Sequence, residues 1–256
     1  MNAVGIIPAR YGSTRLPAKA LAELAGKPLV QHVYEQARKA AALDEVLIAT
    51  DDDRIVQAAL RFGARAVMTD RTHRSGTDRI AEVARQLDAR IILNIQGDEP
   101  LVHPSQLDQL VEFLTAHPAV PVATVMTRLT RPQDAANPNV VKVVVDQDGY
   151  ALYFSRCPIP YVRDRAQGST DTEPSADSLE PTAYWKHLGL YGYQRYFLLQ
   201  FPHLSATALE QAEGLEQLRV LEHGHKIKVL ETVHDTVSVD TAEDLKRVEQ
   251  ELLGKK

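Results

Sequence analysis

Short apolar runs alternate with longer segments of helical periodicity in the first half of the chain. Runs of four to eight β-branched and apolar residues predict strands, whereas apolar residues three and four apart predict one face of a helix. Residues 91–95 are apolar on both faces, which is typical of a strand buried in a parallel sheet. The expected strands are 4–7, 46–50, 66–68 and 91–95, and the expected helices are 30–42, 52–62, 77–87 and 105–115.

The pattern changes after residue 120, where successive strands are predicted with only short connections. The turn at 146–149 joins two of them as an antiparallel pair. One longer segment, 164–181, has little apolar content, and the sequence leaves open whether it is a mobile lid or merely disordered. The later expected elements are strands 122–129, 140–145, 150–155, 188–193 and 227–230, and helices 208–221 and 241–252.

This order of elements predicts an α/β fold with a Rossmann-like, mostly parallel and doubly wound central sheet. The chain has 256 residues, of which 44% are hydrophobic, enough for one large core. We therefore expect a single domain, 1–256, with a nucleotide-binding core of about 1–120 and 205–256. An antiparallel insert of about 121–204 would pack on its side.

Composition excludes several classes of protein. A net charge of -5 argues against a dedicated nucleic-acid-binding protein. No apolar run approaches the roughly 18 residues of a membrane span, and the N-terminus lacks the pattern of a signal peptide. A single cysteine, Cys157, excludes an internal disulfide and fits a reducing compartment. We expect a soluble cytoplasmic protein.

A cationic loop follows the first strand. Arg10, Arg15 and Lys19 lie in it with Ser13 and no acidic residue. Guanidinium groups, an ammonium group and free backbone N–H groups can together surround a polyphosphate. The loop matches neither the Walker A pattern nor the dinucleotide-binding G-x-G-x-x-G pattern. It predicts a nucleoside triphosphate site of another kind, with a solvated connection as the alternative.

Two aspartates are candidate ligands of Mg²⁺. Asp98 follows the strand 91–95, at the strand end where ligands collect in open α/β sheets. Asp240 directly precedes the last expected helix. Mg²⁺ takes one or two carboxylates together with phosphate oxygens and water, so both could serve a triphosphate. A turn or helix cap remains the alternative for Asp98, and an N-cap for Asp240.

A second group of residues suits an acidic, hydroxylated substrate. Arg156 ends a strand and precedes a proline-rich segment that would hold its guanidinium in place. His187, Tyr191 and Tyr193 alternate along the strand, so they share one face and could contact sugar hydroxyls. A half-buried strand with ordinary packing explains the same pattern.

Three polar residues of the expected helix 208–221 also share one face: Glu210, Glu213 and Gln217. A solvated face is their usual explanation. Residues 51–53 are all aspartate and resemble a metal-binding D-x-D motif, but acidic residues are also favoured where a helix begins. The two histidines at 223 and 225 lack an obvious third ligand, which argues against a zinc site.

Eight blocks of sequence, spread over nearly the whole chain, resemble one enzyme family. They are P-A-R-Y-G-S-T-R-L-P-A-K (8–19), S-G-T-D-R (75–79), N-I-Q-G-D-E-P (94–100), N-P-N (137–139) with V-K-V-V (141–144), A-L-Y-F-S-R (151–156), H-L-G-L-Y-G-Y (187–193), L-E-Q-L-R-V-L (215–221) and V-D-T (239–241). In this order they resemble the 3-deoxy-manno-octulosonate cytidylyltransferases, also called CMP-KDO synthetases.

The resemblance implies that CTP and the acidic eight-carbon sugar 3-deoxy-manno-octulosonate (KDO) react to give CMP-KDO and diphosphate, for lipopolysaccharide synthesis. It implies a cytoplasmic homodimer that uses the insert for dimerisation and substrate binding. By analogy, the 75–77 loop and the backbone at Ala9 and Arg10 would recognise cytosine. The nucleotide-binding residues expected in this way are Ala9, Arg10, Ser13, Arg15, Lys19, Ser75, Gly76, Thr77 and Gln96.

The same resemblance assigns roles in the reaction. Mg²⁺ on Asp98 and Asp240 would bridge the triphosphate and the anomeric hydroxyl of the sugar, while Lys19 and Arg15 offset charge on the leaving diphosphate. These four residues are the expected catalytic group. Arg156 would bind the KDO carboxylate, and hydroxyls would be contacted by the remaining substrate-binding candidates: Gln96, His187, Tyr191, Glu210, Glu213 and Gln217.

The family pattern is R-L-P-G-K-P, whereas residues 15–20 of this chain read R-L-P-A-K-A, so that Ala18 stands where the family has glycine. A left-handed backbone there would cost an alanine on the order of 1 kcal/mol and could move Lys19. The alternatives from the same fold are a CMP-sialic acid synthetase and an enzyme that uses the 8-amino analogue of KDO. A non-catalytic nucleotide-binding assembly protein is the alternative from another class.

Overall fold

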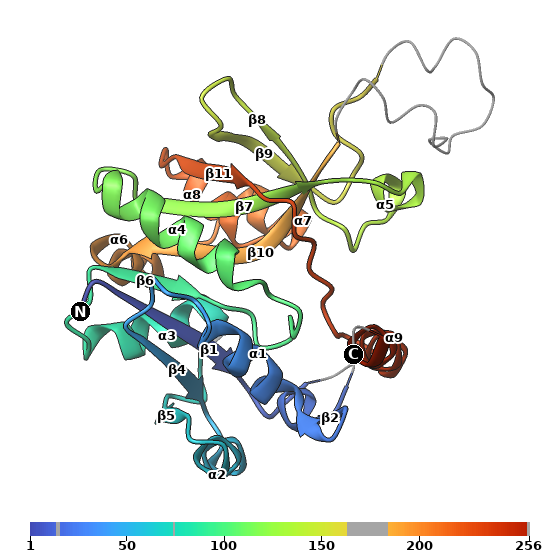
Figure 1. Cartoon of the computed structure of the whole chain (residues 1–256). Coiled ribbons are helices and arrows are strands. Elements are labelled where there is room, and N and C mark those ends of the chain that lie inside the picture. Colours follow the sequence, from blue (N-terminus) through green and yellow to red (C-terminus); the bar gives the residue numbers. More distant parts are fainter. Residues whose placement is uncertain (14–15, 74, 163–183, 255–256) are drawn as a thin grey trace.

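The computed structural model describes residues 1–13, 16–73, 75–162 and 184–254. Within these ranges one large sheet forms the centre of the molecule, and a small ribbon of β2 (Glu23–Leu24) and β3 (Lys27–Pro28) lies beside it (Figure 1). The strands of the large sheet are β1 (Ala3–Ala9), β4 (Glu45–Thr50), β5 (Arg65–Met68), β6 (Ile91–Asn94), β7 (Val122–Arg128), β8 (Lys142–Val145), β9 (Ala151–Ser155), β10 (Trp185–Gln194) and β11 (Ile227–Glu231).

The main path of the sheet runs β11-β7-β10-β6-β1-β4-β5. Strand β10 is antiparallel to both of its neighbours on this path, and the other six strands are parallel to one another. The hairpin of β8 and β9 pairs with the beginning of β10, at Trp185 and Lys186. The mostly parallel sheet with antiparallel additions, predicted from the strand pattern, is confirmed. Strand β7, expected to pair only antiparallel, also pairs in parallel with β11.

Helices cover both faces of the sheet, as expected for a doubly wound fold (Figure 1). Helices α1 and α4 pack on one face, and α3 and α6 pack on the other. The segment 164–181, for which the sequence leaves open a mobile lid or a disordered loop, lies outside the described residues. The helices are α1 (Leu29–Ala37), α2 (Asp53–Arg61), α3 (Gly76–Arg85), α4 (Pro104–Ala116), α5 (Pro132–Ala136), α6 (Arg195–Gln200), α7 (Ala208–Glu213), α8 (Gln217–Glu222) and α9 (Ala242–Gly254).

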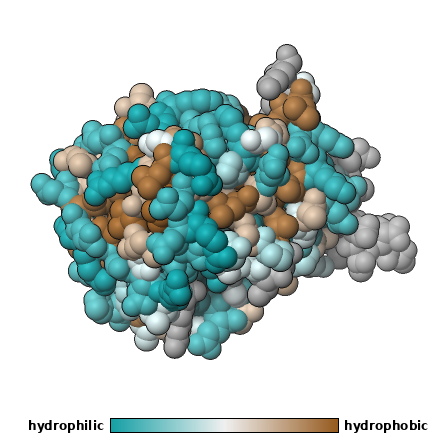
Figure 2. Space-filling view, turned by 90° about the horizontal axis from the view of Figure 1, so that it is seen from below, coloured by the Kyte–Doolittle hydropathy of each residue, from teal (hydrophilic) through white to brown (hydrophobic). Residues whose placement is uncertain are grey.

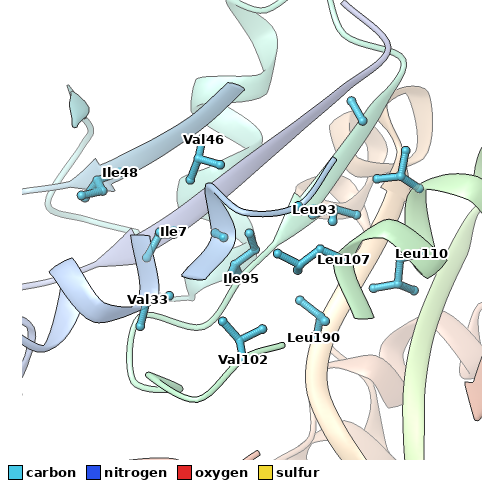
Figure 3. Close-up of a cluster of buried hydrophobic side chains, with 14 of the residues drawn as sticks. Ile7, Val33, Val46, Ile48, Leu93, Ile95, Val102, Leu107, Leu110 and Leu190 are labelled. Carbon is cyan, nitrogen blue, oxygen red and sulfur yellow. The ribbon is translucent and has the colours of Figure 1, made fainter. Parts of the chain in front are cut away.

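The core lies on both sides of the central strands. Ile7 of β1 packs beneath α1 and α4 with Leu93, Ile95 and Leu107 (Figure 3). Its neighbour Ile6 is equally buried in the cluster on the opposite face. This alternation follows from the two-residue period of a strand and explains why β1 is apolar at every position. The central strands are therefore fixed from both sides.

The outer surface is mixed. On the face drawn in Figure 2, hydrophilic residues predominate and hydrophobic residues form several separate patches. No helix in the described ranges is both long and apolar enough to cross a lipid bilayer.

The single helix predicted for 208–221 is wrong. The structure has two short helices, α7 and α8, separated by Gly214. Gly214 has φ 62, in the left-handed region that glycine adopts without the steric cost of a side chain. The residues whose amphipathic spacing predicted one helix therefore belong to two separate helices.

Ala18 adopts the left-handed conformation that the family pattern suggested for this position, with φ 52 and ψ 35. A short 3-10 helix, Lys19–Leu21, begins directly after it. The backbone therefore keeps a turn suited to glycine although the residue is alanine. The left-handed strain at Ala18 lowers the stability of the fold, and the chain still turns into the short helix that begins at Lys19.

Replacing Ala18 by glycine should raise the free energy of unfolding by about 0.5 to 1 kcal/mol, because relief of the left-handed strain exceeds the entropy that glycine adds to the unfolded chain. Denaturant titration of the purified variant measures this change. Ala22, with φ -57, is the matched control, and its replacement by glycine should lower stability. Equal destabilisation by both changes would contradict the strain at Ala18.

Candidate active site

Three neighbouring strands end at the same edge of the sheet. Strand β1 lies between β4 and β6 and is parallel to both. The residues that follow these strands, Arg10, Asp51 and Asp98, therefore emerge side by side. In open α/β sheets this carboxyl edge is where ligands bind.

Lys19 links the two predicted metal ligands. Its Nζ lies 2.5 Å from an Oδ of Asp98 and 2.9 Å from an Oδ of Asp240. The backbone N–H of Val239 donates to the carbonyl of Asp98 at 2.8 Å, which holds the two acidic segments together. Burial opposes the charge of Lys19, but the two carboxylates outweigh it and raise the pKa of this ammonium above its ordinary value. The two aspartates thus converge beside the cationic loop.

Asp51 binds both the cationic loop and helix α3. Its carboxylate accepts the backbone N–H of Tyr11 at 3.4 Å and a guanidinium N–H of Arg79 at 2.8 Å. Arg79 is only 3% exposed and lies on α3, so the pair joins the loop to the helix on its far side. Asp52 caps α2 by accepting the N–H of Arg54. The contacts of both aspartates are structural, which supports the helix-cap interpretation over a metal-binding D-x-D motif.

Two glycines allow the segments around the site to approach closely. A Cβ at Gly97 would lie 2.8 Å from the carbonyl oxygen of Pro8, closer than side chains tolerate. A Cβ at Gly76 would lie 3.3 Å from the Pro8 ring. A residue with a side chain at 97 would therefore push the loop after β6 away from β1.

A first cavity of about 330 Å³ opens between the cationic loop, the start of α3 and the loop after β6. Arg15 lies outside the described residues, and Thr77 borders a second cavity. All the other predicted nucleotide-binding residues line the first cavity: Ala9, Arg10, Ser13, Lys19, Ser75, Gly76 and Gln96.

The second cavity, of about 820 Å³, adjoins the first. Five of the seven predicted substrate-binding residues line it: Gln96, Arg156, His187, Tyr191 and Gln217. The two cavities share the residues at their junction, Gly76, Gln96, Asp98, Glu216 and Asp240. Two ligands bound in these cavities would meet beside the two aspartates.

Arg156 is held at the second cavity by backbone carbonyls. Its Nε donates to the carbonyl of Glu213 at 2.7 Å, and its Nη1 donates to the carbonyl of Pro138 at 2.9 Å. These two acceptors are neutral, so they orient the guanidinium without cancelling its charge, while the Glu213 carboxylate attracts it from a longer distance. Such a group suits an anionic ligand.

His187 is buried and neutral. Burial lowers its pKa from an ordinary value of 6.5 to about 3. Thr124 donates its hydroxyl proton to the carbonyl of Leu190, so we assign a proton to His187 Nε2, which donates to Thr124 Oγ1 at 2.9 Å. A bulge in β10 between Leu188 and Tyr191 interrupts the regular pairing. The Tyr191 ring nevertheless lies 5.4 Å from that of His187, so these two residues remain neighbours.

Glu210 and Glu213 do not reach the second cavity. Glu210 pairs with Arg219 at 2.5 Å, and Glu213 accepts the Ser155 hydroxyl and the backbone N–H of Arg156. The residue at the cavities instead is Glu216, which the sequence analysis missed. It follows the break at Gly214, so helical spacing from Glu210 misplaces it. One indication of Glu216 was available in the sequence, because this residue lies in the 215–221 block that resembles the family.

Glu216 joins the two cavities. It accepts the hydroxyl of Thr77 at 2.9 Å, and burial raises the pKa of its carboxyl above the ordinary value, although the bond from Thr77 opposes this. It therefore links the start of α3, on the nucleotide side, to the second cavity.

The donor chemistry at the junction fits Mg²⁺. Over the described ranges, no group of three or more histidine, cysteine or acidic side chains is arranged to hold a metal ion. Asp98 and Asp240 supply two carboxylates, which is the number that Mg²⁺ commonly takes from a protein when phosphate oxygens and water complete its six ligands. These two side chains alone would not supply six ligands, but the oxygens of a bound polyphosphate and water would supply the others.

This fold, with a cationic loop facing two carboxylates across a cavity, is typical of nucleotidyltransferases. Comparison with known proteins agrees, since a model of the family described as cytidylyltransferase matches residues 4–227. A 3-deoxy-manno-octulosonate cytidylyltransferase of Geobacter sulfurreducens is 51% identical over 252 residues, covering 98% of this chain and 100% of the relative. One from Geotalea uraniireducens is 52% identical over 98% of this chain and 99% of its own.

A solved structure agrees with these relatives. It is described as CMP:2-keto-3-deoxy-manno-octonic acid synthetase complexed with CTP, and it matches with a TM-score of 0.90 and 42% identity over all of both chains. The chain belongs to the 3-deoxy-manno-octulosonate cytidylyltransferase family of nucleotidyltransferases.

The buried His187 predicts a loss of stability in acid. A histidine in the unfolded chain takes up a proton below about pH 6.5 while folded His187 does not, so the unfolded state binds more protons and stability falls as pH falls. Between pH 6.5 and 5 the loss should be on the order of 2 kcal/mol. His187→Gln, which keeps an Nε2 donor for Thr124, should lose correspondingly less over this range.

Urea unfolding of both proteins at closely spaced pH values measures the difference. The exposed His117, changed to glutamine, is the matched control and should keep the slope of the unmodified protein. Parallel stability curves for the unmodified protein and His187→Gln would refute the buried neutral imidazole.

Proposed function

We propose that this chain transfers the cytidylyl group of CTP to KDO, giving CMP-KDO and diphosphate. The observation that supports this most directly is the meeting of Lys19, Asp98 and Asp240 at the junction of two cavities. The family membership supports the same reaction. The first cavity would hold the nucleotide and the second the acidic sugar.

The nucleotide side supplies positive charge and backbone donors. Lys19 and Arg10 face the first cavity and would bind the phosphates, as the family pattern also implies for Arg15. Ser75 and Gly76 line the same cavity where α3 begins, where they could recognise the cytosine base. Asp51 and Arg79 keep the loop and the helix at a fixed distance from each other.

The sugar side supplies an anion site and hydroxyl contacts. Arg156 would bind the carboxylate of KDO, because the bonds that orient its guanidinium go to neutral carbonyls. Neutral His187 with Tyr191 and Gln217 would contact hydroxyl groups. In this arrangement the carboxylate of the sugar would lie at one end of the cavity, with its reacting hydroxyl toward Asp98.

The reaction requires a sugar hydroxyl oxygen in line with the α-phosphorus and the leaving diphosphate. A new bond forms from this oxygen to the α-phosphorus as the bond to diphosphate breaks, and the hydroxyl proton is released to water. Bound Mg²⁺, held by Asp98 and Asp240, would supply positive charge to the reacting oxygens. Lys19 orients those two carboxylates and offsets phosphate charge, so the reaction needs no covalent intermediate on the protein.

We further propose that the protein acts as a homodimer in the cytoplasm and serves lipopolysaccharide synthesis. The support is the resemblance to a family with these properties. Light scattering on the purified protein tests the homodimer, and a monomer at micromolar concentration would contradict it.

Diphosphate release measured with each of four nucleoside triphosphates and a panel of acidic sugars tests the proposed reaction. CTP with KDO should give the highest kcat/KM. Preference for sialic acid or for 8-amino-KDO would identify the corresponding related enzyme. Nucleotide binding without diphosphate release with any sugar would favour a non-catalytic assembly protein.

Asp98→Asn should leave the fold intact and lower turnover at saturating Mg²⁺ by about 10²-fold or more, because it removes a charge that acts on the transition state. Asp53→Asn, at the exposed start of α2, is the matched control and should retain full turnover. Diphosphate release under substrate saturation measures both, with circular dichroism to confirm folding. Full turnover of Asp98→Asn would remove Asp98 from the catalytic group.

A further inference from the structure

Lys142 is a charged residue buried with no exposed surface. It begins β8, and it is among the largest of the fully buried side chains in the described ranges. Removing an ammonium group from water is costly unless its donors are satisfied. Burial lowers the pKa of Lys142 to about 8, so the ammonium form still prevails at neutral pH.

All three donors of this ammonium are used, and each goes to a backbone carbonyl. Nζ donates to Asn137 at 2.9 Å, to Val140 at 2.6 Å and to Arg156 at 2.6 Å. Lysine has three N–H donors, so this set is complete. Lys142 therefore fastens two segments, 137–140 and the end of β9, to one point.

The three acceptor residues share a second property, which is that each lines the larger cavity. Lys142 itself is not among the residues lining that cavity. The ammonium thus lies behind the cavity wall and holds it from the protein side. An apolar residue of similar size could fill this space, but it would remove the ammonium donor from the carbonyls of Val140 and Arg156, while the Asn137 carbonyl would keep the backbone N–H of Val140.

Both ends of Arg156 depend on this arrangement. Its carbonyl is bound by Lys142, and its Nη1 donates to Pro138, which lies between the two other carbonyls that Lys142 binds. The guanidinium is thus supported by a segment whose position Lys142 fixes. Loss of the ammonium would free the carbonyl of Arg156 and loosen the segment that Nη1 binds, while the bonds of Arg156 to Glu213 would remain.

We propose that Lys142 is a positioning residue that places the Arg156 guanidinium for the carboxylate of the acidic sugar. This inference rests on the proposed function and adds a residue to the same site. Lys142 does not touch the substrate. It acts through Arg156, so its loss should weaken the use of the sugar and leave the use of the nucleotide unchanged.

Lys142→Met tests this inference, with KM measured separately for KDO and for CTP. The KM for KDO should rise about tenfold or more, since small displacements of a binding group have effects of this size. The KM for CTP should stay within about twofold of the unmodified value. Lys39→Met, at an exposed lysine just after the end of α1, is the matched control and should change neither constant.

A double-mutant cycle distinguishes positioning from general structural support. If Lys142 acts through Arg156, then Lys142→Met should have little further effect on kcat/KM for KDO in the Arg156→Ala protein. Independent, multiplicative losses would overturn the inference, and so would an equal rise of both KM values. If Lys142→Met does not fold, Lys142→Arg replaces it in the same cycle, with a smaller but equally sugar-specific loss expected.

The unmodified protein separates this inference from the proposed function. Absence of diphosphate release with CTP and KDO in the unmodified protein would refute the proposed function. Normal release there, combined with an unchanged KM for KDO in the folded position-142 variant, would refute only the role of Lys142.

Discussion

One ammonium group between two carboxylates joins parts of the chain that are far apart in sequence. Lys19 is 79 residues from Asp98 and 221 residues from Asp240. The three charges leave the group with a net charge of about -1, since one ammonium offsets only one of two carboxylates. A group with this imbalance favours a further cation, and a triphosphate brings the oxygens that such a cation binds. The charge at the centre of the site thus suits both ligands at once.

The fold makes this meeting possible. Parallel pairing of β1 with β4 and β6 brings the residues after three strands to one edge. Antiparallel β10 then runs beside β6, so Tyr191 lies opposite Asn94, with His187 further along toward the same edge. An all-parallel sheet would have placed the beginning of that strand at the opposite edge. The reversed direction of β10 is therefore what adds the sugar side to a nucleotide-binding edge.

The sequence predicted those parts of the site that depend on local pattern. Asp98 follows a strand apolar on both faces, so its place at the carboxyl edge follows from a rule about parallel sheets. Arg156 was found from the strand that it follows and from the proline-rich segment after it. Glu216 was missed because helical spacing was carried across Gly214, whose left-handed backbone separates two helices. That break depends on backbone geometry, which residue spacing alone does not reveal.

Contacts between distant segments were beyond sequence reasoning for a different physical reason. Nothing in the spacing of 137–144 indicates that Lys142 turns inward, because a lysine on a short strand is more commonly solvated. Likewise the pairing of Asp51 with Arg79 depends on how α3 returns to the sheet. Periodicity reports which face of an element is buried, but it does not report which polar group lies opposite.

The way in which Arg156 is held bears on how a ligand is oriented in the second cavity. On the nucleotide side, Lys19 and Arg79 are paired with carboxylates. On the sugar side, Arg131, Lys186 and Arg247 are also paired with carboxylates, whereas the Arg156 guanidinium donates to neutral carbonyls, so its charge remains available to a ligand in the second cavity. The same cavity ends at Asp98 and Asp240, which are negative. An acidic sugar therefore meets attraction for its carboxylate at one end and repulsion at the other, which favours the orientation that leaves its hydroxyl beside the two aspartates.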